Sequence, residues 1–192
     1  MMKNKISCPI CQSDNVKNHM VTYDFRLNVT SDGILLKKCN NLDCMHIWSA
    51  HIPSDDEIES YYKNDFYKHS KAQSDPITSL NRSNFLNFLR KCGGKKILDV
   101  GAGDGSLVSF LRGKGFHARG IEPSKEGRKT AKKFFGIDLI KENISNIDPK
   151  IERYDVINLS HVLEHVSDPL TMLKKISDLL EDNGSLTLEI PN

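Results

Sequence analysis

The sequence predicts an α/β protein with a doubly wound, incomplete sheet of about five strands, preceded by a small β-rich module and linker helices. Two observations support this fold class. From residue 95 onward, short apolar runs alternate with segments of helical periodicity. Before residue 45, two close cysteine pairs flank a hairpin pattern. We therefore expect a module at 1–52, a helical linker at 53–92 and the α/β domain at 93–192.

The composition is that of a globular chain. Of the 192 residues, 38% are hydrophobic and 27% are charged, and the formal net charge is +2. The Lys and Arg residues are spread along the chain, so they do not predict a nucleic-acid footprint. No apolar run approaches the ~20 residues that span a bilayer, and residues 1–7 lack the apolar core of a secretory signal. We expect a cytoplasmic protein with reduced thiols and no membrane contact.

Two short strand patterns predict the β-rich module. They lie at 22–28 and 34–38, with Ser31-Asp32-Gly33 as the turn between them. A module of this size has little core of its own, so we expect a cross-link or a metal to stabilise it.

Helix signals dominate the linker. Ser54 and Glu57 fit a capping box that begins a short acidic helix, which runs into Tyr61-Tyr62. A polar connector follows at 63–75. A second helix is predicted at about 76–91, where Gly93-Gly94 ends it.

Strands and helices alternate through the α/β domain. Asp168 and Pro169 fit the N-cap and first position of its last helix, and Asn183-Gly184 ends that helix. The predicted strands are 96–100, 117–121, 138–140 (a weaker pattern), 154–159 and 185–190, and the predicted helices are 106–114, 125–135 and 169–181.

A glycine-rich segment joins the first of these strands to the first helix. Gly101, Gly103 and Gly105 tolerate positive φ and lack a Cβ, so the loop can bring a ligand to the free N–H groups of the helix. A dinucleotide fingerprint has its third glycine one residue later, and Asp99 suits a cation better than a pyrophosphate. The spacing favours S-adenosylmethionine over NAD, and a structural tight turn is the alternative.

Glu122 ends the second strand. It lies about 20 residues after the loop, the offset at which a carboxylate meets ribose hydroxyls. With this carboxylate and the alternating pattern around it, a purely structural turn becomes the weaker interpretation.

Residues 95–192 resemble the class I, Rossmann-like S-adenosylmethionine-dependent methyltransferases. This resemblance implies methyl transfer as the activity and S-adenosylmethionine as the cofactor. The segments that carry it are Ile97-Leu98-Asp99-Val100-Gly101-Ala102-Gly103-Asp104-Gly105, Gly120-Ile121-Glu122-Pro123-Ser124, Tyr154-Asp155-Val156-Ile157, His161-Val162-Leu163-Glu164-His165-Val166 and Leu188-Glu189-Ile190-Pro191-Asn192.

The resemblance also implies the roles of single residues. Gly101 and Gly103 would pass the methionine part of the cofactor, with Asp99 near its ammonium, and Glu122 would hold the ribose. Asn143 stands where many relatives carry aspartate beside the adenine. The full set of cofactor-binding candidates is Asp99, Gly101, Ala102, Gly103, Glu122, Pro123, Asn143, Ile144, Leu159 and Ser160.

Two histidines follow the fourth strand, where the transferred methyl group should lie. Either His161 or His165 could take a proton from an acceptor, and we treat both as catalytic candidates. The alternative is a structural role, in which these residues and Glu164 cap a helix and bond to the loop. A base is needed only if the nucleophile is protonated.

The four cysteines of the module are candidate metal ligands. Cys8 and Cys11 form a knuckle with two intervening residues, and Cys39 and Cys44 form one with four. Four thiolates at one end of a hairpin suit a closed, structural zinc site. The alternatives are unrelated thiols, or His46 in place of one cysteine. The fifth cysteine, Cys92, is interpreted as an ordinary thiol.

Residues 1–70 resemble the N-terminal part of a bacterial methyltransferase group that carries a four-cysteine zinc ribbon. Members of that group commonly act on sugars, nucleotide-linked sugars or other small metabolites. This chain departs from the pattern in its longer second knuckle, where two intervening residues are usual. Zinc ribbons in general also bind nucleic acid, so the module alone leaves the acceptor open.

Three functional hypotheses follow. The leading one is a methyltransferase for a small molecule, such as a sugar or nucleotide-linked sugar, with no nucleic-acid partner. The second is an RNA methyltransferase whose ribbon binds RNA, and the third is a non-catalytic S-adenosylmethionine-binding or assembly module. Five strands instead of the family's seven leave an apolar edge. We expect a fragment that binds cofactor but lacks much of the acceptor pocket. The alternative is that a partner, such as a second copy in a homodimer, covers this edge.

Overall fold

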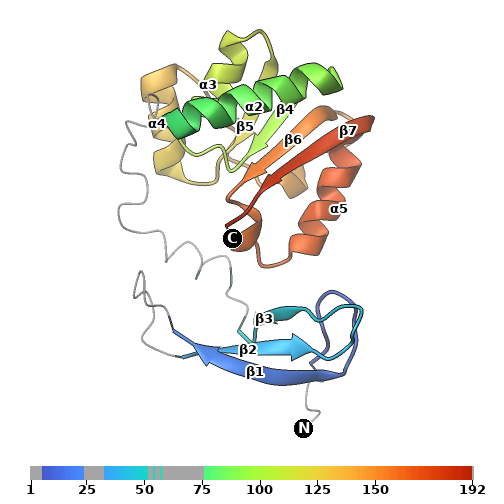
Figure 1. The fold of residues 1–192 in the computed structure, drawn as a ribbon. Helices are drawn as coiled ribbons and strands as arrows, with labels where there is room; N and C mark the ends of the chain where they lie inside the picture. The colour runs from blue at the N-terminus through green and yellow to red at the C-terminus, as the bar shows by residue number, and fades with distance from the viewer. Residues whose placement is uncertain (1–5, 24–32, 52–53, 55–56, 58–75, 192) are drawn as a thin grey trace. The chain divides into compact units, whose positions relative to one another are not determined.

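The computed structural model describes residues 6–23, 33–51, 54, 57 and 76–191 (Figure 1). The chain divides into two compact units, Met1–Lys63 and Asn64–Asn192. The second unit includes α2 (Pro76–Cys92), the helix that the sequence placed at the end of the linker.

The described part of the first unit contains a three-stranded antiparallel sheet in the order β1-β2-β3. β1 (Val16–Thr22) pairs with β2 (Ile34–Cys39), and β3 (Ile47–Ser49) pairs with the other edge of β2. β2 agrees with its prediction to within one residue, whereas the sequence did not predict β3.

The first strand lies earlier in the chain than the strand pattern at 22–28 indicated. β1 ends at Thr22, and residues 24–32 lie outside the described part of the chain. The register explains the difference, because Val16 lies opposite Cys39. Cys39 must lie beside the first cysteine pair, so its partner strand begins soon after that pair rather than ten residues later.

Ser54 and Glu57 form the predicted capping box. The Ser54 backbone N–H donates to Glu57 Oε2 at 2.8 Å, and the Glu57 backbone N–H donates to Ser54 Oγ at 3.3 Å. Hydrogen bonds from Ser54 lower the pKa of the Glu57 carboxyl. The rest of the predicted helix and the connector at 63–75 lie outside the described residues.

A parallel sheet of four strands, in the order β5-β4-β6-β7, forms the centre of the second unit (Figure 1). The predicted weak strand at 138–140 appears only as a single parallel bridge between Ile140 and Ile121, at the outer side of β5. The strands are β4 (Lys96–Val100), β5 (His117–Ile121), β6 (Tyr154–Ser160) and β7 (Leu180–Glu189).

Helices cover both faces of this sheet, as the predicted doubly wound fold requires (Figure 1). On one face α2, α3 (Ser106–Gly113) and α4 (Lys125–Phe135) bury an apolar cluster with β4 and β6. On the other face α5 (Pro169–Leu179) buries a second cluster. The helices contribute Leu86, Leu89, Val108, Leu111 and Ala131 to the first cluster and Ile176 and Leu179 to the second.

The junction between α5 and β7 differs from the prediction. The helix ends at Leu179, and β7 begins at Leu180 rather than at residue 185. Leu180 pairs with Tyr154 and Ser185 pairs with Val156, so residues 181–184 form a register shift. The Asn-Gly signal at 183–184 therefore marks an irregularity inside a strand rather than the end of a helix.

The strand order defines where a ligand can bind. The chain runs from β4 to β5 on one side and then crosses to β6 on the other side of β4. Such a change of direction leaves a crevice at the carboxyl ends of the strands. The glycine loop, Glu122 and Ser160 all lie at these carboxyl ends. Within the described residues, no helix is long and apolar enough to cross a membrane.

Candidate functional site

The glycine loop follows β4, and its three glycines have left-handed backbone conformations that other residues rarely adopt. Gly101, Gly103 and Gly105 have φ values of +73°, +53° and +75°. The backbone N–H groups of Gly101 and Ala102 both donate to the carbonyl of Ile121 at 2.9 Å, which holds the loop against the end of β5. A Cβ at Gly103 would meet nothing within 4 Å, so the space beside this residue is open.

Glu122 is the buried anchor of this loop. Its side chain is only 3% exposed, and its two carboxylate oxygens accept from two backbone N–H groups. Oε2 accepts from Gly103 at 2.7 Å, and Oε1 accepts from Ser124 at 2.8 Å. The carboxylate that was predicted to hold a ribose therefore also connects the glycine loop to the start of α4.

Two further residues of this region were not predicted from the sequence. Arg128 Nη1 donates to the carbonyl oxygen of Glu122 at 2.7 Å and also to that of Pro123. A Cβ at Gly127 would lie 2.7 Å from the Gly103 carbonyl oxygen and 2.8 Å from Glu122 Cγ, so only glycine fits between them. An isolated glycine inside a helical pattern was the available signal, because such a residue often marks a close approach.

Gly127→Ala is expected to destabilise the protein although alanine favours helix. The helical gain is at most about 1 kcal/mol, whereas overpacking against fixed neighbours costs about 1–3 kcal/mol. Gly113→Ala in α3 is the matched control, because its Cβ would meet nothing within 4 Å. In urea, the free energy of unfolding should fall for Gly127→Ala and rise for Gly113→Ala. An equal rise in both variants would contradict the close packing at Gly127.

Asp99 lies inside the sheet rather than at its surface. The residue is 4% exposed, and Oδ1 accepts from Asn158 Nδ2 at 2.7 Å. Burial raises the pKa of the Asp99 carboxyl to about 7, the Asn158 hydrogen bond opposes this rise, and the negative charges of Glu122 and Asp104 add to it. Three carboxyl groups therefore influence one another beside the loop, and the charge of Asp99 is present above about pH 7 and is lost below it.

The remaining cofactor candidates line the same edge of the sheet or lie close to it. Asn143 caps the short 3₁₀ helix η2 (Ile144–Asn146), where its Oδ1 accepts from the Ser145 N–H at 3.2 Å. Ile144 and Leu159 are buried, and Pro123 is exposed. Ser160 Oγ donates to Glu189 Oε2 at 2.8 Å, which joins the ends of β6 and β7.

The two candidate histidines both lie near one carboxylate oxygen. His161 Nδ1 is 3.5 Å from Glu164 Oε1, and His165 Nε2 is 3.8 Å from the same oxygen. His161 has a positive φ of 54°, and its backbone N–H donates to the Glu189 carbonyl at 2.9 Å. The segment is thus held at the carboxyl ends of β6 and β7, and both rings are about half exposed to solvent.

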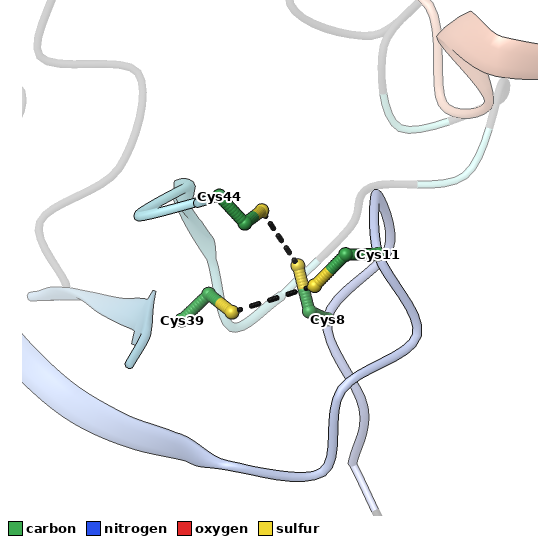
Figure 2. A group of neighbouring side chains, drawn as sticks. All are labelled: Cys8, Cys11, Cys39 and Cys44. Atoms are coloured by element: carbon green, nitrogen blue, oxygen red, sulfur yellow. Dashed lines mark hydrogen bonds between the residues drawn. The ribbon is translucent and has the colours of Figure 1, made fainter. Parts of the chain in front are cut away.

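The four cysteines of the first unit meet at one point. Figure 2 shows their side chains directed toward one another from the two knuckles. The sulfurs of Cys8 and Cys44 are 3.7 Å apart, those of Cys11 and Cys39 are 3.6 Å apart, and all four lie within 4.8 Å of one another. A tetrahedral zinc ion with Zn–S bonds of about 2.3 Å places its sulfurs about 3.8 Å apart. The donor set therefore fits zinc in both chemistry and spacing.

Burial opposes ionisation of both Cys8 and Cys39, and the neighbouring thiols raise the pKa of Cys39 further. Backbone N–H groups of Cys11 and Ile10 lower the pKa of Cys8 in spite of its burial. A cation between the sulfurs would allow all four to ionise. His46 stacks on Trp48 instead of joining the thiols, and Cys92 lies in the other unit.

The fold, the glycine loop and the carboxylate that follows the second strand define a Rossmann-like methyltransferase architecture. Residues 74–192 match the family described as "Methyltransferase domain", and the chain belongs to this family. The predicted kinship with class I S-adenosylmethionine-dependent methyltransferases is thereby confirmed.

Ubiquinone biosynthesis O-methyltransferases are among the curated relatives. The protein of Bradyrhizobium diazoefficiens is 32% identical over 112 residues, which is 56% of this chain and 44% of that protein. The protein of Actinobacillus pleuropneumoniae serotype 5b is 31% identical over 140 residues, covering 63% of this chain and 60% of that protein. The chain thus spans about half the length of the curated relatives it matches.

Solved structures share the fold. The plantazolicin methyltransferase BpumL, in complex with a pentazolic desmethylPZN analog and SAH, has a TM-score of 0.51 and 22% identity. The match covers 68% of this chain and 51% of that chain. A complex of BpumL with a monoazolic analog gives the same TM-score at 23% identity, over 70% of this chain and 52% of that one. The α/β fold predicted from the sequence is therefore confirmed.

Proposed function

We propose that this chain binds S-adenosylmethionine and belongs to an enzyme that transfers its methyl group to a small molecule. The observation that carries the proposal is the open glycine loop fixed by Glu122. Gly103 leaves room beside the backbone, and the loop's fold depends on a carboxylate placed at the end of β5. A nucleoside ligand would bind at this end of the sheet, with its ribose at Glu122 and its adenine toward η2.

The charge of the site supports a cationic ligand over a dinucleotide. Asp99, Asp104 and Glu122 lie close enough for the two latter charges to raise the pKa of the first. Such a concentration of carboxylates repels a pyrophosphate and attracts an ammonium or a sulfonium. The cofactor, when bound, supplies an electrophilic methyl group on its sulfonium.

The residues after β6 would serve the methyl acceptor. His161 and His165 share Glu164 at the carboxyl ends of β6 and β7, so either ring could accept a proton from an acceptor hydroxyl, amine or activated carbon. For the acceptor we propose a sugar or nucleotide-linked sugar, because the ribbon resembles that of methyltransferases acting on such molecules. Methyl transfer depends mainly on positioning the acceptor in line with the methyl group.

The cysteine cluster is proposed to hold one structural zinc ion. Cys8, Cys11, Cys39 and Cys44 would supply all four ligands, which leaves no open position for catalysis. The ion would stabilise the ribbon without taking part in methyl transfer.

Calorimetry with S-adenosylhomocysteine tests the cofactor, with NADH as the control ligand. We expect one site for S-adenosylhomocysteine and none for NADH; the reverse would overturn the proposal. Transfer of a labelled methyl group by a chain extended to the length of its relatives tests the acceptor. Label on nucleotide-linked sugars would support the proposed acceptor, label on RNA would favour an RNA methyltransferase, and binding without transfer would favour a non-catalytic module.

A further inference from the structure

A row of polar side chains crosses the sheet beneath the glycine loop. The strand register places Asn158 of β6 opposite Asp99 of β4 and opposite Thr187 of β7. Asn158 is 8% exposed and Asp99 is 4% exposed, and the residues next to each along its strand are buried and apolar. Polar groups in such a position are costly unless they are hydrogen-bonded, so the row is a feature to be explained.

The hydrogen bonds of this row have one direction. Asn158 Nδ2 donates to Asp99 Oδ1 at 2.7 Å, which is the direction that an ionised carboxylate requires. The Asn158 Oδ1 then lies on the other side, 2.7 Å from Thr187 Oγ1. Since an amide oxygen only accepts, the Thr187 hydroxyl donates to it. Protons therefore point from β7 through β6 toward the Asp99 carboxylate.

The surroundings of Asp99 otherwise oppose its charge. Burial is the largest influence, and the carboxylates of Glu122, at the end of β5, and Asp104, in the glycine loop, act in the same direction. The hydrogen bond from Asn158 on β6 is the influence that favours the ionised form. No cation is among the groups that act on Asp99 within the described part of the chain.

We propose that Thr187 and Asn158 are positioning residues that hold Asp99 as a carboxylate, so that the edge strand β7 sets the affinity for the positively charged methionine end of the cofactor. The inference rests on the proposed binding of S-adenosylmethionine. Asp99 acts through its charge and needs no direct contact, because the low dielectric of the sheet transmits that charge to the adjacent loop.

The proposal has a signature in the pH dependence of binding. The pKa of Asp99 is raised to about 7, so its charge is present above this pH and is lost as the pH falls through it. The affinity for an ammonium-bearing ligand should follow that charge. Loss of the Thr187 hydroxyl leaves Asn158 less polarised, so the pKa of Asp99 rises further and the midpoint moves to higher pH.

The experiment measures S-adenosylhomocysteine affinity from pH 5.5 to 8.5 for the unaltered chain, Thr187→Val and Thr187→Ser. The unaltered chain should bind more tightly as the pH rises, with a midpoint near 7. Thr187→Val should move the midpoint up by about half a pH unit, the effect of one weakened hydrogen bond. Thr187→Ser keeps the hydroxyl and should restore the original midpoint. Thr130→Val in α4 is the matched control.

Two further measurements separate charge from structure. Asp99→Asn should bind S-adenosylhomocysteine about tenfold more weakly at pH 8 and lose the pH dependence, since the charge that attracts the ammonium is absent. 5′-Methylthioadenosine, which lacks the ammonium, should bind the unaltered chain without this pH dependence. If Thr187→Val does not fold, Thr187→Ala replaces it.

The outcomes distinguish this inference from the proposed function. An equal loss of affinity at every pH in Thr187→Val, or an unchanged midpoint, would overturn the positioning role while leaving cofactor binding intact. Failure of the unaltered chain to bind S-adenosylhomocysteine at any pH would overturn the proposed function itself.

Discussion

Cys39→Ser is expected to abolish zinc binding and to disorder the first unit. Cys39 is fully buried at the end of β2, opposite the first residue of β1. Cys8 is the only other fully buried apolar side chain in the described part of this unit. Apolar packing alone therefore stabilises the first unit only weakly. Structural zinc contributes on the order of 10–16 kcal/mol in zinc-finger peptides, far more than such packing supplies.

Elemental analysis and hydrogen exchange measure these two effects. The unaltered chain should carry about one zinc per chain, and β1 and β2 should exchange slowly. Cys39→Ser should lack the metal and exchange rapidly in both strands, while the second unit keeps its protection. Cys92→Ser is the matched control, because this thiol donates to the Leu89 carbonyl in α2. Slow exchange of β1 and β2 in metal-free Cys39→Ser would contradict a structural zinc.

The parallel sheet could be predicted from the sequence because its signals are local. β4 and β5 match their predicted bounds, and β6 extends its own by one residue. Each strand shows a local pattern of buried residues, continuous in β4 and alternating in β5. The start of α5 was predicted from a cap, and Asp168 Oδ1 accepts from the Thr171 N–H at 3.1 Å.

Features that depend on distant contacts could not be predicted in this way. The position of β1 follows from the register that places Cys39 near the first knuckle, and no pattern within residues 16–28 contains that information. The requirement for glycine at position 127 comes from the Gly103 carbonyl, which is 24 residues earlier in the chain. Asn158 and Thr187 were likewise visible only as polar residues in apolar strands, and the register places Thr187 beside Asn158 and Asn158 beside Asp99.

In the candidate site, too, local features were predicted and features that depend on distant contacts were not. The sequence predicted the glycine loop and Glu122 as binding residues from their spacing, and the structure brings both to one edge of the sheet. It did not indicate that Glu122 also supports the loop, because that role depends on the Gly103 N–H turning back toward β5. The roles of the single site residues remain predictions that substitutions must test.

Glu122→Gln is expected to weaken S-adenosylhomocysteine binding by about 10- to 150-fold, which corresponds to about 1.5–3 kcal/mol for hydrogen bonds to a charged group. Each carboxylate oxygen accepts from one backbone N–H, at Gly103 and at Ser124. A glutamine offers a single oxygen, and its NH₂ group would face a second donor. The loop would therefore lose one anchor, and the ribose hydroxyls would lose a charged acceptor.

Comparing two ligands shows whether Glu122→Gln loses affinity for the nucleoside part of the cofactor. 5′-Methylthioadenosine contains the ribose and lacks the ammonium, so Glu122→Gln should weaken it as much as S-adenosylhomocysteine, whereas Asp99→Asn should weaken only the latter. Glu126→Gln is the matched control, because Glu126 is exposed and pairs with Lys129 at the surface of α4, where an ion pair contributes about 0–1 kcal/mol. Affinities for both ligands within twofold of the unaltered chain, in a Glu122→Gln protein with a normal unfolding transition, would remove Glu122 from the binding site. In that case the carboxylate would only support the loop.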